Sequence, residues 1–171
     1  MKPILKLFFG LLFTLCPYTI FADNKDLNLI TTACDRTLYK DLCRAVLLNH
    51  PKARTTTELR VLARVALKYA LISAKQVETQ IRKLKDAPAA LKDCAENFQS
   101  ATQQISYSFK ALKSKSYGDI NIWVSAAMTG VDSCEEGFKE LKSNYPIDKS
   151  SKIFNQLCSI VLAFTNQLNS H

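Results

Sequence analysis

Cysteine is the residue type in this sequence with the clearest capacity for chemistry, because two suitably placed cysteines form a disulfide. Cys34 and Cys43 frame the short segment Cys34-Asp-Arg-Thr-Leu-Tyr-Lys-Asp-Leu-Cys43, whereas Cys94 and Cys134 lie farther along the chain within longer helical patterns. In the chain-entropy model, closing the short loop stabilises a fold by roughly 2–3 kcal/mol, and closing a Cys94–Cys134 loop by about 4 kcal/mol. The spacing alone leaves other pairings open.

Two further cysteines fall outside these candidate pairs. Cys16 lies in an apolar N-terminal stretch, and Cys158 follows Leu157 in an apolar stripe, where we expect a buried free thiol that packs as a small hydrophobic side chain. The chain has no Cys-x-x-Cys motif, and its only histidines are His50 and His171. We therefore expect no zinc site, no other metal and no cofactor.

Acidic and histidine side chains offer little for catalysis. His50 falls in a predicted loop, and neither histidine has a nucleophile and a carboxylate nearby in the pattern. Asp132, Glu135 and Glu136 could act as acids or bases, but they occupy the polar turns of a predicted helix, and charged helix surface explains them better. Neither a glycine-rich phosphate loop nor a nucleophile elbow occurs. These observations predict a protein that is not an enzyme.

Residues 1–22 have the pattern of a secretory signal peptide. Lys2 and Lys6 supply a positive start, and the apolar run over residues 7–15 is shorter than the about 20 residues of a membrane-spanning helix. We expect this segment to be removed and residues 23–171 to form one exported, soluble domain.

The charge of the chain is basic. It is +8 at pH 7, and removing Lys2 and Lys6 with the leader would lower it to +6. The positive residues are dispersed, which suits retention near an anionic matrix such as de-esterified pectin or docking to an acidic partner, and equally suits a plain solvated surface. Because no nucleic-acid-binding motif occurs, a nucleic acid is not an expected partner.

The elements that position these residues are helical. Glycine and proline are scarce, and apolar residues recur three or four positions apart through most of the chain. This periodicity predicts four long helices, over residues 55–84, 88–113, 119–141 and 148–168. Short connections favour antiparallel neighbours, so the predicted fold is all-α: an up-down-up-down four-helix bundle at 55–171, preceded by a helical hairpin at 23–54.

Local signals predict where these helices begin. Thr55-Thr56-Thr57-Glu58 has the pattern of a capping box, and Asp86-Ala87-Pro88 predicts a break followed by a new first turn. A polar stretch over residues 114–118 predicts a connection, after which Asp119 is expected to cap the next helix. Trp123 lies on the apolar stripe of that helix, so we expect it to pack in the core.

Several of these segments together resemble a known family. They are Ile30-Thr31-Thr32-Ala33-Cys34 with Tyr39 and Cys43, Leu91-Lys92-Asp93-Cys94 with Phe98, and Trp123-Val124-Ser125-Ala126-Ala127-Met128-Thr129 leading to Asp132-Ser133-Cys134-Glu135-Glu136-Gly137-Phe138. The pattern is similar to that of the plant invertase and pectin methylesterase inhibitors, and the resemblance covers essentially all of residues 23–171. It implies a four-helix bundle with an N-terminal hairpin, disulfides Cys34–Cys43 and Cys94–Cys134, and an unpaired Cys158.

The resemblance also implies a function. Family members bind one carbohydrate-active enzyme one to one and block its active-site cleft; some inhibit pectin methylesterases and others cell-wall or vacuolar invertases. A Pro-Lys-Phe tripeptide marks one type of invertase inhibitor, and the matching stretch here, residues 115–120, lacks it. The run Tyr117-Gly118-Asp119-Ile120-Asn121-Ile122-Trp123 is closer to the pectin methylesterase inhibitors. We therefore expect a secreted pectin methylesterase inhibitor of the apoplast, with an inhibitor of cell-wall or vacuolar acid invertase as the alternative.

The partner is expected to contact the exposed sides of the second and third bundle helices and their connection. The candidate contact residues are Asn97, Gln104, Tyr107, Lys113, Tyr117, Asp119 and Asn121. Tyr107 and Tyr117 suit anchor roles, because aromatic side chains bury much area at little entropic cost.

Two rival functions come from other classes. A secreted helical signalling ligand usually needs long crossover connections, whereas the predicted connections are short. A cationic membrane-active protein is disfavoured because the polar helix faces mix acidic and amide residues with lysine, so a membrane is not an expected partner.

Overall fold

The computed structural model describes residues 24–84 and 89–170; the expected leader at residues 1–22 and the break at Asp86-Ala87-Pro88 lie outside them. All regular secondary structure in the described residues is helical, which confirms the all-α prediction. The helices are α1 (Asn24–Asp35), α2 (Lys40–Leu48), α3 (Pro51–Arg54), α4 (Leu59–Lys83), α5 (Ala89–Ser114), α6 (Tyr117–Glu140) and α7 (Asp148–Asn169).

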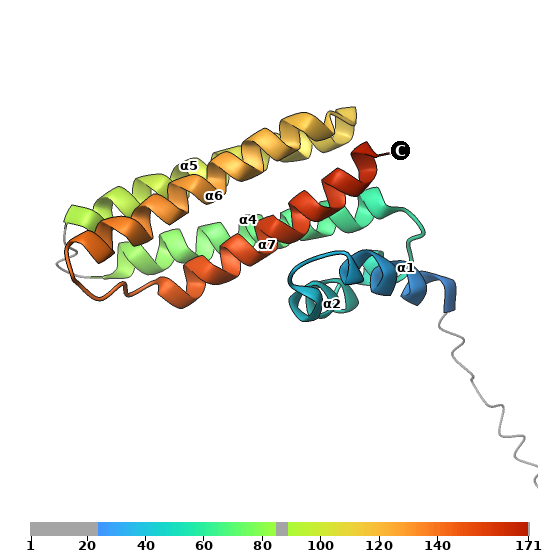
Figure 1. Cartoon of the computed structure of the whole chain (residues 1–171), viewed down its shortest axis with the longest axis horizontal. Helices are drawn as coiled ribbons and strands as arrows, with labels where there is room; N and C mark the ends of the chain where they lie inside the picture. The colour runs from blue at the N-terminus through green and yellow to red at the C-terminus, as the bar shows by residue number, and fades with distance from the viewer. Residues whose placement is uncertain (1–23, 85–88, 171) are drawn as a thin grey trace, which may run out of the picture.

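The four long helices form an up-down-up-down bundle, as predicted. Helices α5 and α6 lie side by side in one layer, and α4 and α7 form the other (Figure 1). The connection between α5 and α6 contains only two residues, so these helices are obliged to run antiparallel. Each helix turns one apolar stripe inward, and the fully buried aromatic residues Phe98, Phe154 and Phe164 fill the space between the layers.

The N-terminal helices pack at one end of the bundle, near the start of α4 (Figure 1). The Cys34–Cys43 disulfide joins the end of α1 to α2, with 5.6 Å between the Cα atoms. Thr37 Oγ1 donates to the carbonyl of Cys34 at 2.8 Å, which closes the turn between the two helices. Ile30 and Leu47 are buried, so the disulfide fixes a small apolar unit against α4.

The start of α4 differs from its prediction. Helix α4 begins at Leu59, so Glu58 occupies the N-cap position instead of the third helical position that a capping box requires. The Glu58 backbone N–H donates to Thr56 Oγ1 at 3.1 Å, and its carboxylate lies 3.4 Å from the Arg60 guanidinium. The hydroxyl therefore stabilises the turn before the helix, and the predicted capping box at residues 55–58 is wrong.

The start of α6 also differs. This helix begins at Tyr117, two residues before the predicted Asp119 cap, and Asp119 instead lies in its first turn. A carboxylate there still stabilises the helix through the positive end of its dipole. Helix α5 ends in a Schellman motif, in which Lys115 has φ 61° and the Ser116 N–H donates to the Ala111 carbonyl at 2.9 Å. This tight reversal shortens the connection and allows α6 to begin early.

Candidate partner-binding face

Helices α5 and α6 are locked in register at two levels. The Cys94–Cys134 disulfide, with 5.2 Å between Cα atoms, fixes one level, and the Tyr107 and Trp123 rings, with centroids 5.2 Å apart, fix the other. The disulfide confirms the second pairing that the resemblance implied. Because the two helices are antiparallel, Gln104 lies near the level of Ala126 between these two points.

The position of Trp123 differs from the one predicted from the sequence. It is 36% exposed, and the neighbouring Ile122 is 64% exposed, so the prediction that Trp123 packs in the core is wrong. The buried stripe of α6 is already complete without it, running through Ile120, Val124 and Ala127. Trp123 therefore lies at the edge of this stripe, where its indole rests on the Tyr107 ring.

The two aromatic rings form an exposed apolar patch. Tyr107 is 43% exposed, and the planes of the Tyr107 and Trp123 rings are inclined at 59°. The ammonium of Lys110 lies 5.7 Å from the centre of the Tyr107 ring, which adds a cation–π contact. The two rings thus support each other and keep part of their surface exposed to a partner. The sequence pointed to Tyr107 for this role but not to Trp123, because Trp123 and the buried Val124 both fall within one apolar stripe.

The structure brings four of the seven expected contact residues to this surface. Along α5, Gln104 lies about two turns after Asn97 and Tyr107 about one turn after Gln104, and Asp119 lies about one turn before Trp123 on α6. Asn97 and Gln104 are half-buried, whereas Asp119 is exposed. We call the set Asn97, Gln104, Tyr107, Asp119 and Trp123 the α5/α6 face.

The other three expected residues lie elsewhere. The Asn121 amide donates to Asn166 Oδ1 and accepts from Thr165 Oγ1, both at 2.6 Å, so it joins α6 to α7. Tyr117 is half-buried and packs against the core. Lys113 lines a hollow beside α4 instead of the junction with α6.

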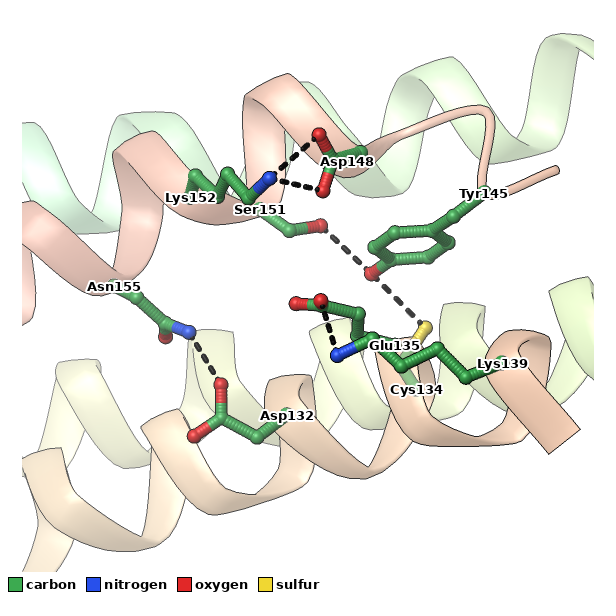
Figure 2. A network of polar contacts seen from close by, with 9 residues as sticks. All are labelled: Asp132, Cys134, Glu135, Lys139, Tyr145, Asp148, Ser151, Lys152 and Asn155. Carbon is green, nitrogen blue, oxygen red and sulfur yellow. Dashed lines mark hydrogen bonds and ion pairs between the residues drawn. The ribbon is translucent and has the colours of Figure 1, made fainter.

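Two of the three acidic residues considered for catalysis, Asp132 and Glu135, have structural partners (Figure 2). Asn155 donates to Asp132 at 2.6 Å, and Glu135 pairs with Lys139 at 2.7 Å. Glu136 is exposed. These contacts agree with the interpretation of Asp132 and Glu135 as helix surface.

Tyr145, in the connection between α6 and α7, lies close to these pairs and forms polar contacts of its own (Figure 2). Its hydroxyl contacts Ser151 Oγ at 2.8 Å and donates to the disulfide sulfur of Cys134 at 3.3 Å. Burial raises the pKa of Tyr145 to about 12, so the phenol stays protonated at ordinary pH. The hydroxyl thus serves as a neutral hydrogen-bonding group.

Cys158 is fully buried and, among the described cysteines, is the one outside the two disulfides. Burial raises the pKa of its thiol well above the usual range, which suppresses the reactive thiolate. No set of three or more histidine, cysteine, aspartate or glutamate residues in the described part of the chain is arranged to hold a metal. Within the same residues, no helix is long and apolar enough to cross a membrane.

Comparison with known proteins connects this architecture to characterised relatives. A pectinesterase inhibitor of Actinidia deliciosa is 30% identical over 82% of this chain and 80% of its own. A Platanus acerifolia protein named "Putative invertase inhibitor" is 32% identical over 76% of each chain. The crystal structure of a mutant form of an Arabidopsis pectin methylesterase inhibitor superposes with a TM-score of 0.67 at 26% identity, covering 80% of this chain and 95% of the other.

The family model described as plant invertase/pectin methylesterase inhibitor matches residues 28–164, which include the hairpin disulfide, the α5/α6 face and most of α7. The named relatives are inhibitors, which agrees with the expectation that the chain is not an enzyme. From its sequence, its two disulfides and its bundle, the chain belongs to the plant invertase/pectin methylesterase inhibitor family.

Proposed function

We propose that this protein inhibits a plant pectin methylesterase by binding it one to one and covering its active-site cleft with the α5/α6 face. The exposed Tyr107–Trp123 pair is the observation that carries the proposal. Tyrosine and tryptophan are enriched among residues that dominate binding energy, and a patch that is already packed on one side loses little conformational entropy on binding.

The helices that present this patch favour a rigid contact. The Cys94–Cys134 disulfide and the short α5–α6 connection hold the two helices together at both ends of the face. Helix α5 has 26 residues and is therefore about 40 Å long, which is enough for an interface of ordinary size. Asn97 and Gln104 supply amides beside the aromatic pair, and Asp119 supplies a charge at its edge.

The choice of target rests on the connection between α5 and α6. This connection consists of Lys115 and Ser116, and the stretch from residue 115 to 120 that matches the Pro-Lys-Phe position lacks that tripeptide. The Actinidia and Arabidopsis relatives named as pectinesterase inhibitors support the same choice. An acid invertase is the second candidate target, because the Platanus relative shows slightly higher identity. We place the activity outside the cell, in the apoplast, and in the vacuole if the target is a vacuolar invertase.

The test is a titration of a pectin methylesterase and an acid invertase with oxidised protein comprising residues 23–171, with residual activity measured at apoplastic pH. We expect stoichiometric loss of esterase activity alone. Replacing Trp123 with alanine is expected to weaken inhibition by about 30-fold, equivalent to about 2 kcal/mol. The matched control is Ile72→Ala, which replaces an exposed apolar residue of α4. This variant is expected to leave inhibition unchanged.

Inhibition of the invertase alone would mean that the target is an acid invertase and not a pectin methylesterase. Equal weakening by Trp123→Ala and Ile72→Ala would remove the α5/α6 face from the proposal. No inhibition of either enzyme by a folded protein, verified by its helical circular dichroism, would overturn the proposed function.

A further inference from the structure

A second surface of the molecule carries a concentration of positive charge that the proposed inhibition does not use. Where α3 meets the first half of α4, a hollow of about 280 Å³ is lined by His50, Lys52, Val61, Arg64, Val65, Lys68 and Phe109. A second hollow of about 280 Å³ adjoins it, sharing Val61 and Arg64 and adding Arg60, Leu112 and Lys113. Together we call them the α3/α4 groove.

The cations of the first hollow are uncompensated. Among the described residues, Lys52, Arg64 and Lys68 form no ion pair with any carboxylate. In the adjoining hollow, Arg60 pairs with Glu58 at 3.4 Å. Like charges gathered without counter-charges repel one another, so an anion bound among them gains attraction from several cations at once.

The groove also has an apolar wall and an unsatisfied polar atom. Phe109 lies beneath the guanidinium of Arg64, which is 5.7 Å from the ring centre, and Val61 and Val65 extend this wall along α4. His50 Nδ1 is buried and has no hydrogen-bond partner in the described structure, although buried polar groups are normally bonded. This apolar wall suits the apolar ring face of a ligand, and His50 lines the hollow beside it.

We propose that the α3/α4 groove binds an acidic polysaccharide segment with a free carboxylate on successive sugar rings. The carboxylates pair with Lys52, Arg64 and Lys68, and the ring faces pack on Val61 and Phe109. Two adjoining hollows suit a chain better than a single small anion. The choice of a carboxylate polymer rests on the proposed function, since hydrolysis of pectin methyl esters leaves free carboxylates on successive sugar units.

Binding of this polymer in the groove would localise the inhibitor. Ester hydrolysis makes the substrate polymer increasingly anionic, so the groove would concentrate the inhibitor where its target has been active. The groove lies beside α3 and between α4 and α5, whereas the aromatic pair lies between α5 and α6. Because Phe109 and Tyr107 point about 160° apart around α5, one molecule can engage polymer and enzyme together.

The experiment measures binding of a de-esterified oligogalacturonide to the full oxidised inhibitor by calorimetry at low ionic strength, without any enzyme. Its methyl-esterified counterpart is the uncharged control, and we expect at least tenfold weaker binding of that control. The double variant Lys52→Gln/Lys68→Gln is expected to weaken oligogalacturonide binding about tenfold or more. Lys92→Gln/Lys149→Gln removes the same charge from exposed positions outside the groove and is expected to change binding less than twofold.

Three outcomes would overturn the proposal: no binding of the oligogalacturonide, equal weakening by the two double variants, or equal competition by inorganic phosphate at the same concentration. The second would show attraction by net charge alone, and the third a general anion site. Esterase inhibition by the same variants separates this proposal from the proposed function. Lys52→Gln/Lys68→Gln is expected to inhibit normally, so failure of polymer binding leaves inhibition standing, and failure of inhibition leaves polymer binding standing.

Discussion

The side chain of Tyr145 connects several separate parts of the bundle. Its hydroxyl contacts Ser151 of α7 and the Cys134 sulfur of α6 (Figure 2). The centroid of its ring also lies 5.1 Å from that of the Phe138 ring. The Ser151 hydroxyl also donates to the Ile147 carbonyl at 3.0 Å. A single phenol therefore fixes the α6–α7 connection against the disulfide that holds α5 and α6 together.

The burial of this phenol predicts a pH dependence. The pKa of Tyr145 is raised to about 12, whereas an unfolded tyrosine titrates near 10. The stabilisation is therefore fully present below pH 10 and is lost as the pH rises toward 12. We expect urea unfolding of the native protein to show a greater loss of stability between pH 9 and 11 than that of Tyr145→Phe, which lacks the titrating group.

The same variant also tests the hydrogen bonds. At pH 7, Tyr145→Phe is expected to lower the free energy of unfolding by about 1 kcal/mol, because the Ser151 hydroxyl keeps its bond to Ile147. Tyr107→Phe, at an exposed site, is the control for loss of a phenol. Identical pH profiles for the native protein and Tyr145→Phe would show that the Tyr145 hydroxyl is solvated.

At the scale of helices, the sequence predicted the elements better than their ends. The apolar period identifies α4 through α7 because each helix buries one long stripe, and this averages over many residues. A helix start depends instead on a few local bonds. The Thr56 hydroxyl and the positive φ of Lys115 moved the starts of α4 and α6 from their predicted positions.

Only part of the α5/α6 face could likewise be predicted from the sequence. Tyr107 could be identified from the sequence, because it falls between buried positions of α5. Trp123 could not be identified in this way, because an apolar stripe is wide enough to include both Trp123 and Val124. Only the packing of α6 against its neighbours determines which of the two side chains is buried. The pairing of Tyr107 with Trp123 depends on the α5–α6 register, which two distant segments determine together.

Helix α6 contains a site for stabilisation. Gly130 lies in its interior, and a Cβ atom added there would meet no atom of the neighbouring elements within 4 Å. Alanine loses less backbone entropy on folding, so Gly130→Ala is expected to raise the free energy of unfolding by about 0.5–1 kcal/mol. Chemical denaturation measures this change. The control is Gly118→Ala, in the first turn of the same helix, which is expected to raise the free energy of unfolding by less.

Gly130→Ala also tests whether the partner enzyme approaches α6 at this position. By register with the Cys94–Cys134 and Tyr107–Trp123 contacts, Gly130 lies at a level between them. A variant that gains stability but inhibits less would mean that the partner approaches the α6 backbone here. Lower stability would contradict the open space around this residue.

At the scale of the whole molecule, stability depends on how the α5/α6 layer packs on the α4/α7 layer. No disulfide joins these layers within the described residues, because Cys94–Cys134 lies inside one layer and Cys34–Cys43 inside the hairpin. The layers are held by side chains such as Phe98 of α5 and Phe154 of α7, whose buried rings meet edge to face with centroids 5.8 Å apart. Such a pair contributes about 0.5–1.5 kcal/mol beyond its area.

A double-mutant cycle tests this account of the layers. We expect Phe98→Leu and Phe154→Leu each to lower the free energy of unfolding, and the double variant to lose about 0.5–1.5 kcal/mol less than the sum, since either substitution removes the shared ring contact. Phe138 is the control partner for Phe98: it lies about two helical turns beyond the level of Phe98 in α6, so this second pair is expected to be additive within about 0.5 kcal/mol. Coupling of equal size in both cycles would mean that the core relaxes as one unit. The rigidity proposed for the α5/α6 face would then depend on the whole bundle, and not on its own disulfide and aromatic pair.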